Sequence, residues 1–148
     1  MLPEKLREIV ELFESFSEEE RRESLIAYAE QSKQYEPLEE EAFDLQDIRK
    51  DEECADSVGL HLKVKEDRRV YFKIKLGPHV QTLTRAMASL LCEGLNGSLL
   101  EEVLELPQEF IKRIVGGELY RVRSQTVYYI LTRMKGICRV CKSRCAVG

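Results

Sequence analysis

The sequence predicts an α+β fold, a single domain in which helices pack on a small antiparallel β-sheet. Its 148 residues are the size of one ordinary domain. Over residues 58–76, apolar and polar side chains alternate with a period of two, and Glu66, Asp67 and Arg68 interrupt the alternation as a hairpin turn would. Before and after this stretch, apolar side chains recur at helical spacing, which predicts helices on both sides of the hairpin.

Two helices are predicted ahead of the hairpin. The first covers residues 4–14. Ser17 followed by Glu20 has the form of a capping box and begins the second helix. Residues 34–53 are interpreted as an acidic loop, with a short strand near Gln46–Arg49. Connections of this length are more often functional than accidental.

The two strands of the hairpin each have one apolar and one basic face. Alternation of this kind is typical of a sheet that is packed on one side only. The residues expected on the buried face are Val58, Leu60, Leu62, Val64, Val70, Phe72, Ile74 and Leu76. Those expected on the basic face are His61, Lys63, Lys65, Tyr71, Lys73 and Lys75.

Helices are predicted again after the hairpin, over residues 80–95, 99–104, 107–115 and 124–135. Asn96 and Gly97 close the first of these as a C-terminal cap. The sequence thereby divides into a domain, residues 1–136, and a basic, cysteine-containing C-terminal tail, residues 137–148.

Composition and charge exclude several classes of function. No apolar run approaches the roughly 20 residues that span a bilayer, so no membrane association is expected. The first residues lack a signal-peptide pattern, which predicts a cytoplasmic location. Trp is absent and no helix-turn-helix or zinc-finger spacing occurs, which argues against nucleic acid as a partner. Residues 1–57 carry 19 acidic and 7 basic side chains, whereas residues 58–148 carry 8 and 16. We expect these two halves to pack together.

The sequence also argues against chemistry that needs clustered histidines or a phosphate-binding loop. The only histidines are His61 and His79, and no Gly-rich loop or Gly-x-Ser-x-Gly motif occurs. The candidates for chemistry are therefore the five cysteines. Cys92 lies beside Leu90 and Leu91 in a predicted helix, which indicates a buried, inert thiol.

Three cysteines of the tail, Cys138, Cys141 and Cys145, form a Cys-x2-Cys-x3-Cys pattern. Three interpretations remain open: incidental thiols, ligands of zinc or an iron–sulfur cluster with a fourth ligand from elsewhere, and redox or sulfur-relay thiols. Their basic neighbours are expected to lower the thiol pKa values and make them reactive. These neighbours are Arg139, Lys142 and Arg144.

Cys54 lies where the acidic loop meets the first strong strand, in the stretch Glu53-Cys54-Ala55-Asp56-Ser57-Val58. On these local features it is either an ordinary buried cysteine at the start of a strand or a thiol presented to a partner.

The segment from Cys54 onward resembles the SufE family. The family pattern is a cysteine, a Ser or Thr two residues on, and then Val and an alternating strand; the corresponding stretch here is Glu53-Cys54-Ala55-Asp56-Ser57-Val58. Glu93-Gly94-Leu95-Asn96-Gly97 matches a second family stretch in full, followed by Glu101-Glu102-Val103-Leu104 and Phe110. Arg123 matches the arginine at the start of the last helix. The resemblance covers roughly residues 4–136.

The resemblance implies a SufE/IscU-like fold and a sulfur acceptor rather than an enzyme. Cys54 would be the nucleophile that takes persulfide sulfur from a cysteine desulfurase of the SufS type, stimulating that enzyme, and would pass it to iron–sulfur scaffold proteins. No cofactor is implied, and the protein would be a monomer or a homodimer. Asp51, Glu52, Glu53 and Asp56 surround Cys54 in sequence and disfavour its thiolate. Arg123 is the candidate for the compensating cation.

Two other readings come from the same residues. Asp56 and Gly59 stand where the family has Ser or Thr and an aromatic residue, and Tyr120-Arg121 and Thr126 also depart from its pattern. Asp56 and Gly59 suggest a non-catalytic interaction or regulatory module of the same fold. The other reading is a metal- or cluster-binding protein that uses the C-terminal cysteines.

Overall fold

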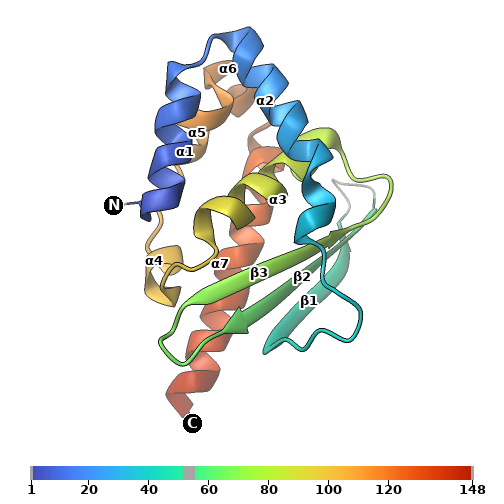
Figure 1. Ribbon diagram of the computed structural model, residues 1–148, viewed down its shortest axis with the longest axis vertical. Helices are drawn as coiled ribbons and strands as arrows, with labels where there is room; N and C mark the ends of the chain where they lie inside the picture. Colours follow the sequence, from blue (N-terminus) through green and yellow to red (C-terminus); the bar gives the residue numbers. More distant parts are fainter. Residues whose placement is uncertain (1, 52–55, 148) are drawn as a thin grey trace.

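The computed structural model describes residues 2–51 and 56–147, and within these residues it is an α+β domain, as predicted (Figure 1). The helices and strands follow in the order α1 (Glu4–Ser15), α2 (Glu18–Glu30), the short 3-10 helix η1 (Ser32–Tyr35), β1 (Leu45–Asp51), β2 (Asp56–Val64), β3 (Val70–Leu76), α3 (Thr82–Leu95), α4 (Leu100–Leu104), α5 (Phe110–Val115), α6 (Gly117–Val122) and α7 (Ser124–Val147).

The sheet formed by the described residues is antiparallel, with the strand order β1-β2-β3. The register pairs Leu45 with Leu62 at one end of β1 and Asp51 with Asp56 at the other. The short strand expected near Gln46–Arg49 is therefore real and longer than predicted. This strand, β1, forms an edge of the sheet and adds a third strand beside β2 of the hairpin.

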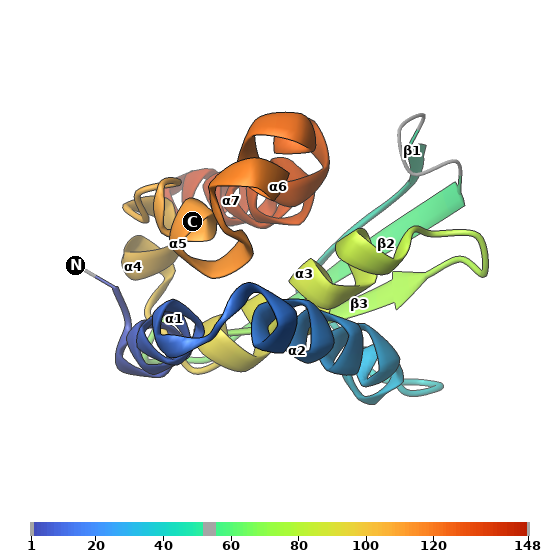
Figure 2. The same cartoon turned by 90° about the horizontal axis from the view of Figure 1, so that it is seen from above.

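The core lies between the inner face of the sheet and the helices. The alternating residues predicted for this face are buried, among them Leu60, Leu62 and Phe72 at 0% exposure, except Val64 at the end of β2, which is only half-buried. Helix α3 packs on β3, and α7 contacts β1 and β2. Helices α1 and α2 cover α3 from the other side (Figures 1 and 2). The capping box of Ser17 and Glu20 is formed at the start of α2.

The free edge of β3 is closed by the segment that follows α3. The side-chain amide of Asn96 accepts a hydrogen bond from the Phe72 N–H at 2.7 Å and donates one to the Phe72 carbonyl at 3.2 Å. Gly97 follows with φ of +92°, a conformation that favours glycine. The Asn96-Gly97 pair thus covers an edge that would otherwise be open to pairing.

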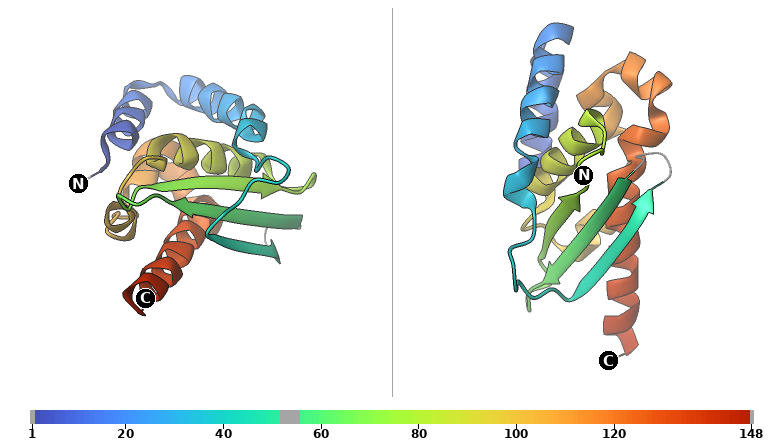
Figure 3. Two further views of the ribbon diagram at one scale, coloured as in Figure 1. Left: turned by 60° about the horizontal axis from the view of Figure 1, so that its bottom comes forward. Right: turned by 90° about the vertical axis from the view of Figure 1, so that its right-hand side faces the viewer.

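The outer face of the sheet is only partly the basic surface that the alternation predicts. The segment between η1 and β1 runs alongside this face (Figure 3). The ring of Phe43 lies 4.9 Å from that of His61, and Glu41 forms an ion pair of 2.7 Å with Lys63. His61 is therefore buried, contrary to the prediction from the strand period.

Two further predictions about helices are wrong. Residues 117–122 form α6, which the sequence pattern did not indicate. The last helix does not end near Lys135 but continues through Gly136 to Val147, and it buries Ile137, Cys138 and Cys141. The contacts of these three side chains with the core stabilise the helix beyond Gly136.

The two oppositely charged halves do pack together, as expected. Ion pairs join Glu14 to Arg113, Glu41 to Lys63 and Asp47 to Arg133. Among the described residues, no helix has both the length and the hydrophobicity that crossing a membrane requires.

Candidate functional site

The nucleophile expected from the sequence, Cys54, lies outside the described residues. It belongs to the stretch of sequence that joins β1 to β2, whose flanking residues Asp51 and Asp56 are paired across the two strands. The surroundings of these strand ends are described, and they define the candidate site.

Asp56 is bonded to the loop that follows β3, residues 77–81. Its carboxylate accepts hydrogen bonds from the backbone N–H groups of Ser57 and His79, both at 2.7 Å. The Gly77 N–H donates to the Ser57 carbonyl at 2.9 Å. A Cβ on Gly77 would stand 2.3 Å from the Asp56 carboxylate, which is far inside van der Waals contact. The approach of the carboxylate to this loop therefore requires glycine at position 77.

Two arginines hold the same loop from the helical side. Arg85 of α3 donates to the carbonyls of Gly77 at 2.5 Å and Val80 at 3.1 Å. Arg123, at the junction of α6 and α7, donates to the side-chain oxygen of Gln81. The 77–81 loop thus links Asp56, α3 and Arg123. Sequence reasoning named Arg123 but missed Arg85 and Gln81, because neither carries a motif.

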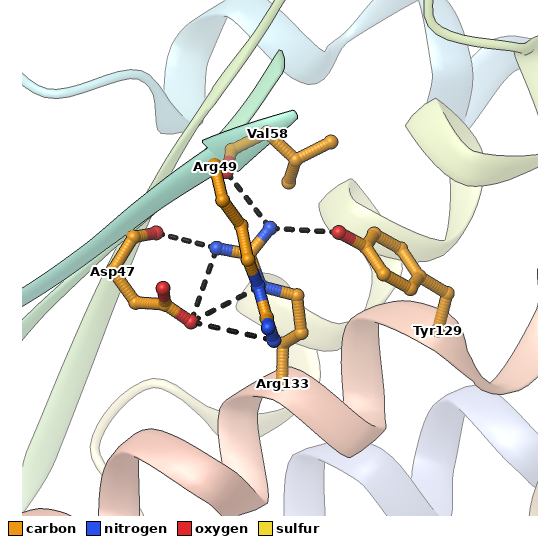
Figure 4. Close-up of polar contacts among 5 residues, drawn as sticks. All are labelled: Asp47, Arg49, Val58, Tyr129 and Arg133. Carbon is orange, nitrogen blue, oxygen red and sulfur yellow. Dashed lines mark hydrogen bonds and ion pairs between the residues drawn. The ribbon is translucent and has the colours of Figure 1, made fainter. Parts of the chain in front are cut away.

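A third arginine ties the two arms of the β1–β2 hairpin to α7 (Figure 4). The Arg133 side chain is 1% exposed and donates to the Val58 carbonyl of β2 at 2.8 Å and to the Asp47 carbonyl of β1 at 2.5 Å. It also pairs with the Asp47 carboxylate at 3.2 Å and donates to the Tyr129 hydroxyl at 2.9 Å. Both strands that lead to Cys54 are therefore fixed to the same helix.

Two of the described cysteines, Cys92 and Cys138, have buried thiols with raised pKa values. Cys92 is fully buried, and burial raises the pKa of its thiol. Cys138 is also fully buried, and burial raises the pKa of its thiol to about 12, with Cys141 adding to the shift. The expectation that basic neighbours lower the pKa of the tail thiols is wrong for Cys138, because desolvation outweighs the charge of Arg139.

Of the tail cysteines, Cys141 lies at the other end of the sheet. Cys141 is 6% exposed and lines a cavity together with Asp44 and Leu45, where β1 begins, whereas Cys54 follows the end of β1. The side chain of Cys145 lies outside the described residues. Among the side chains that are described, no group of three or more His, Cys, Asp or Glu could hold a metal ion.

Comparison with known proteins points to one family. The model of the SufE family, described as an Fe-S metabolism associated domain, matches residues 7–138. A search of curated proteins found no match. Among solved structures, the solution structure of a hypothetical protein from Thermus thermophilus is similar, with a TM-score of 0.73 and 26% sequence identity. The alignment covers 97% of this chain and 99% of that one.

Proposed function

Because this chain belongs to the SufE family, we propose that it is a sulfur acceptor that carries persulfide sulfur on Cys54. Membership associates the chain with Fe-S metabolism. The proposal adds the finer role: the donor is a cysteine desulfurase, which the acceptor stimulates by unloading it, and the sulfur is destined for iron–sulfur cluster assembly.

The chemistry is an exchange between a thiolate and a persulfide. The Cys54 thiolate attacks the outer sulfur of the persulfide on the desulfurase. A bond forms between the Cys54 sulfur and that atom while the sulfur–sulfur bond of the donor breaks, and the electron pair leaves on the donor's cysteine as a thiolate. Nothing is oxidised or reduced overall, so the step needs no metal and no organic cofactor.

The observation that carries the assignment to Cys54 is the burial of the other cysteines inside the family match. The matched segment, residues 7–138, contains Cys54, Cys92 and Cys138. Cys92 and Cys138 are both 0% exposed with raised thiol pKa values, so neither offers a thiolate to a protein partner. Cys54 is the cysteine that remains.

The described surroundings of Cys54 also suit a carrier. Arg133 anchors both strands that lead to it, and Asp56 anchors the start of β2 to the 77–81 loop. A thiol that must meet the persulfide of another protein benefits from strands that are held in place, because the orientation of the thiol is then set before the two proteins dock. Arg123 reaches the same loop through Gln81, which supports its role as the nearby cation.

Mass spectrometry after incubation with a cysteine desulfurase and free cysteine tests the proposal. The protein should gain the mass of one sulfur atom on the peptide that contains Cys54, and Cys54→Ser should abolish the gain with the fold intact. Cys145→Ala serves as the matched control and should keep it. Sulfur uptake by Cys54→Ser would refute the assignment, and no uptake by the wild-type protein would favour the non-catalytic module.

A further inference from the structure

The outer face of the sheet contains a groove of about 780 Å³. We call it the outer groove. Gly59 and His61 of β2 line it together with Ile48 of β1, and it reaches Ser57 and Gly77. Ser57 and Gly77 lie beside Asp56, so the groove extends to the end of the sheet where β1 stops and β2 begins.

The walls of the outer groove hold the two most exposed large apolar side chains of the described residues. Leu38 is 71% exposed and Ile48 is 62% exposed, and both line the groove. Exposed apolar side chains that are scattered singly need no explanation, but a pair that borders one concavity indicates a site for a partner.

The turn that carries Leu38 is held in place by contacts of the Glu41 side chain. One oxygen of the Glu41 carboxylate accepts a hydrogen bond from the Leu38 N–H at 2.8 Å, and the other pairs with Lys63 at 2.7 Å. Glu40 adopts φ of +68°, in the left-handed region that non-glycine residues rarely occupy. A turn held in this way keeps Leu38 in one orientation, which lowers the entropy lost when a partner binds.

The groove also contains a polar group without a partner. His61 is 6% exposed, and within the described part of the chain its Nδ1 atom has no hydrogen-bond partner. Its Nε2 atom lies 3.4 Å from the point where a Cβ on Gly59 would stand. Because Gly59 has no side chain, the imidazole of His61 borders the groove directly at this position.

The charges on the rim indicate what that occupant carries. Glu36, Glu39 and Glu40 form no ion pair with any described residue, whereas Glu41 is neutralised by Lys63. Lys75 of β3 also lines the groove. The wall formed by residues 36–41 therefore presents uncompensated negative charge beside the exposed Leu38.

We propose that the outer groove is the docking site for an extended segment of the sulfur-donating desulfurase. The segment places an apolar side chain between Leu38 and Ile48 and basic residues against Glu39 and Glu40. This proposal rests on the proposed function, since it names the surface through which the donor reaches the end of the sheet that carries Cys54.

The test uses a double variant, Leu38→Ser with Ile48→Ser, in the full-length protein. The matched control is Leu12→Ser with Val140→Ser, which removes apolar side chains that are 51% and 46% exposed on α1 and α7, outside the groove. Binding of the organism's own cysteine desulfurase is measured by titration, and sulfur transfer to Cys54 is measured against desulfurase concentration. The groove variant should bind about tenfold more weakly and need about tenfold more desulfurase for half-maximal transfer, with its rate at saturation kept. The control should match the wild type in both measurements.

A charge reversal tests the basic character of the segment. Glu39→Lys should weaken binding at low salt, with a smaller effect at high salt, because screening removes attraction between exposed charges. Glu66→Lys, on the turn between β2 and β3, should have no such effect.

The outcomes separate the two proposals. If the wild type binds the desulfurase but accepts no sulfur, the proposed function fails, and weaker binding by the groove variant still supports the docking site. If the wild type accepts sulfur and the groove variant has unchanged binding and half-saturation, the docking site is wrong and the proposed function stands. If the wild type does not bind, both are wrong.

Discussion

The carboxylate of Asp56 accepts a hydrogen bond from the backbone N–H of His79 at 2.7 Å, which joins the first residue of β2 to the loop after β3. The sequence indicated Asp56 as a negative charge near Cys54 and as a departure from the family's Ser or Thr. The structure adds a positioning role, because the same carboxylate also accepts the Ser57 N–H and packs directly on Gly77. Replacing Asp56 therefore alters both charge and geometry at this end of the sheet.

Gly77→Ala is expected to destabilise the protein through its clash with Asp56. The new Cβ would stand 2.3 Å from the carboxylate, so the loop or the carboxylate must move, at a cost of about 1–3 kcal/mol in the free energy of unfolding. In an Asp56→Ser background the clash disappears and the loss should be smaller. Chemical denaturation of the four proteins of this double-mutant cycle measures the coupling.

Gly136→Ala is the control for that cycle. A Cβ there meets no atom within 4 Å, and position 136 lies inside α7, so alanine should stabilise the protein by about 0.5–1 kcal/mol. An equal loss from Gly77→Ala in both backgrounds would show that Asp56 is not the clashing group.

Asp56→Ser and Asp56→Asn should both make Cys54 react faster with a small alkylating reagent in the free protein. Each removes a negative charge two residues from the thiol, which increases the thiolate fraction, by about threefold for a shift of half a pKa unit. The rate of alkylation, followed by mass spectrometry of the Cys54 peptide, measures this. Faster reaction of the serine variant alone would assign the effect to the lost hydrogen bonds, because asparagine keeps a side-chain oxygen that can accept the His79 N–H.

Arg123→Ala should slow sulfur uptake and leave stability almost unchanged. Its side chain is exposed and its described bond is to the Gln81 side chain, so the free energy of unfolding should change by less than about 0.5 kcal/mol. Arg121→Ala is the matched control, because Arg121 is 75% exposed two positions away and pairs only with Glu118 among the described ion pairs. Uptake rates that fall equally in both variants would indicate general electrostatics rather than a role for Arg123.

Replacing the three tail cysteines by alanine should leave sulfur uptake by Cys54 intact. Cys141 lies where β1 begins, at the far end of the strand from Cys54, so direct exchange between them is not expected. Substitution is a better test than deletion of residues 137–148, because Ile137, Cys138 and Cys141 belong to the core and their removal would unfold part of α7. Loss of uptake in the triple variant, with an unchanged melting temperature, would establish a relay.

The strands were predictable because one sheet face is buried, and burial imposes a period of two on residues 58–76. Helix α7 was predictable only as far as Lys135, since the contacts that continue it past Gly136 are tertiary. The candidate site was harder to predict from the sequence. Gly77 and Arg85 act through backbone atoms, and Arg133 reaches two strands that lie far from it in sequence, so no local pattern could indicate them.

His61 should make stability fall as the pH is lowered below neutrality. Burial lowers the pKa of its imidazole, and Lys75 adds to this while Glu41 opposes it. An unfolded histidine has a pKa of about 6.5, so on acidification the unfolded state binds the proton first. The contribution of His61 is therefore fully present above about pH 6.5 and is lost as the pH falls through the lowered pKa of the folded state, with a slope of at most about 1.4 kcal/mol per pH unit.

The free energy of unfolding, measured by denaturant titration between about pH 7.5 and 5.5, should lose this slope in His61→Gln. His79→Gln is the control, because the His79 side chain is exposed, and it should keep the slope. A slope that survives in His61→Gln would assign the pH dependence to other groups and would mean that the imidazole is protonated as readily in the groove as in the unfolded chain.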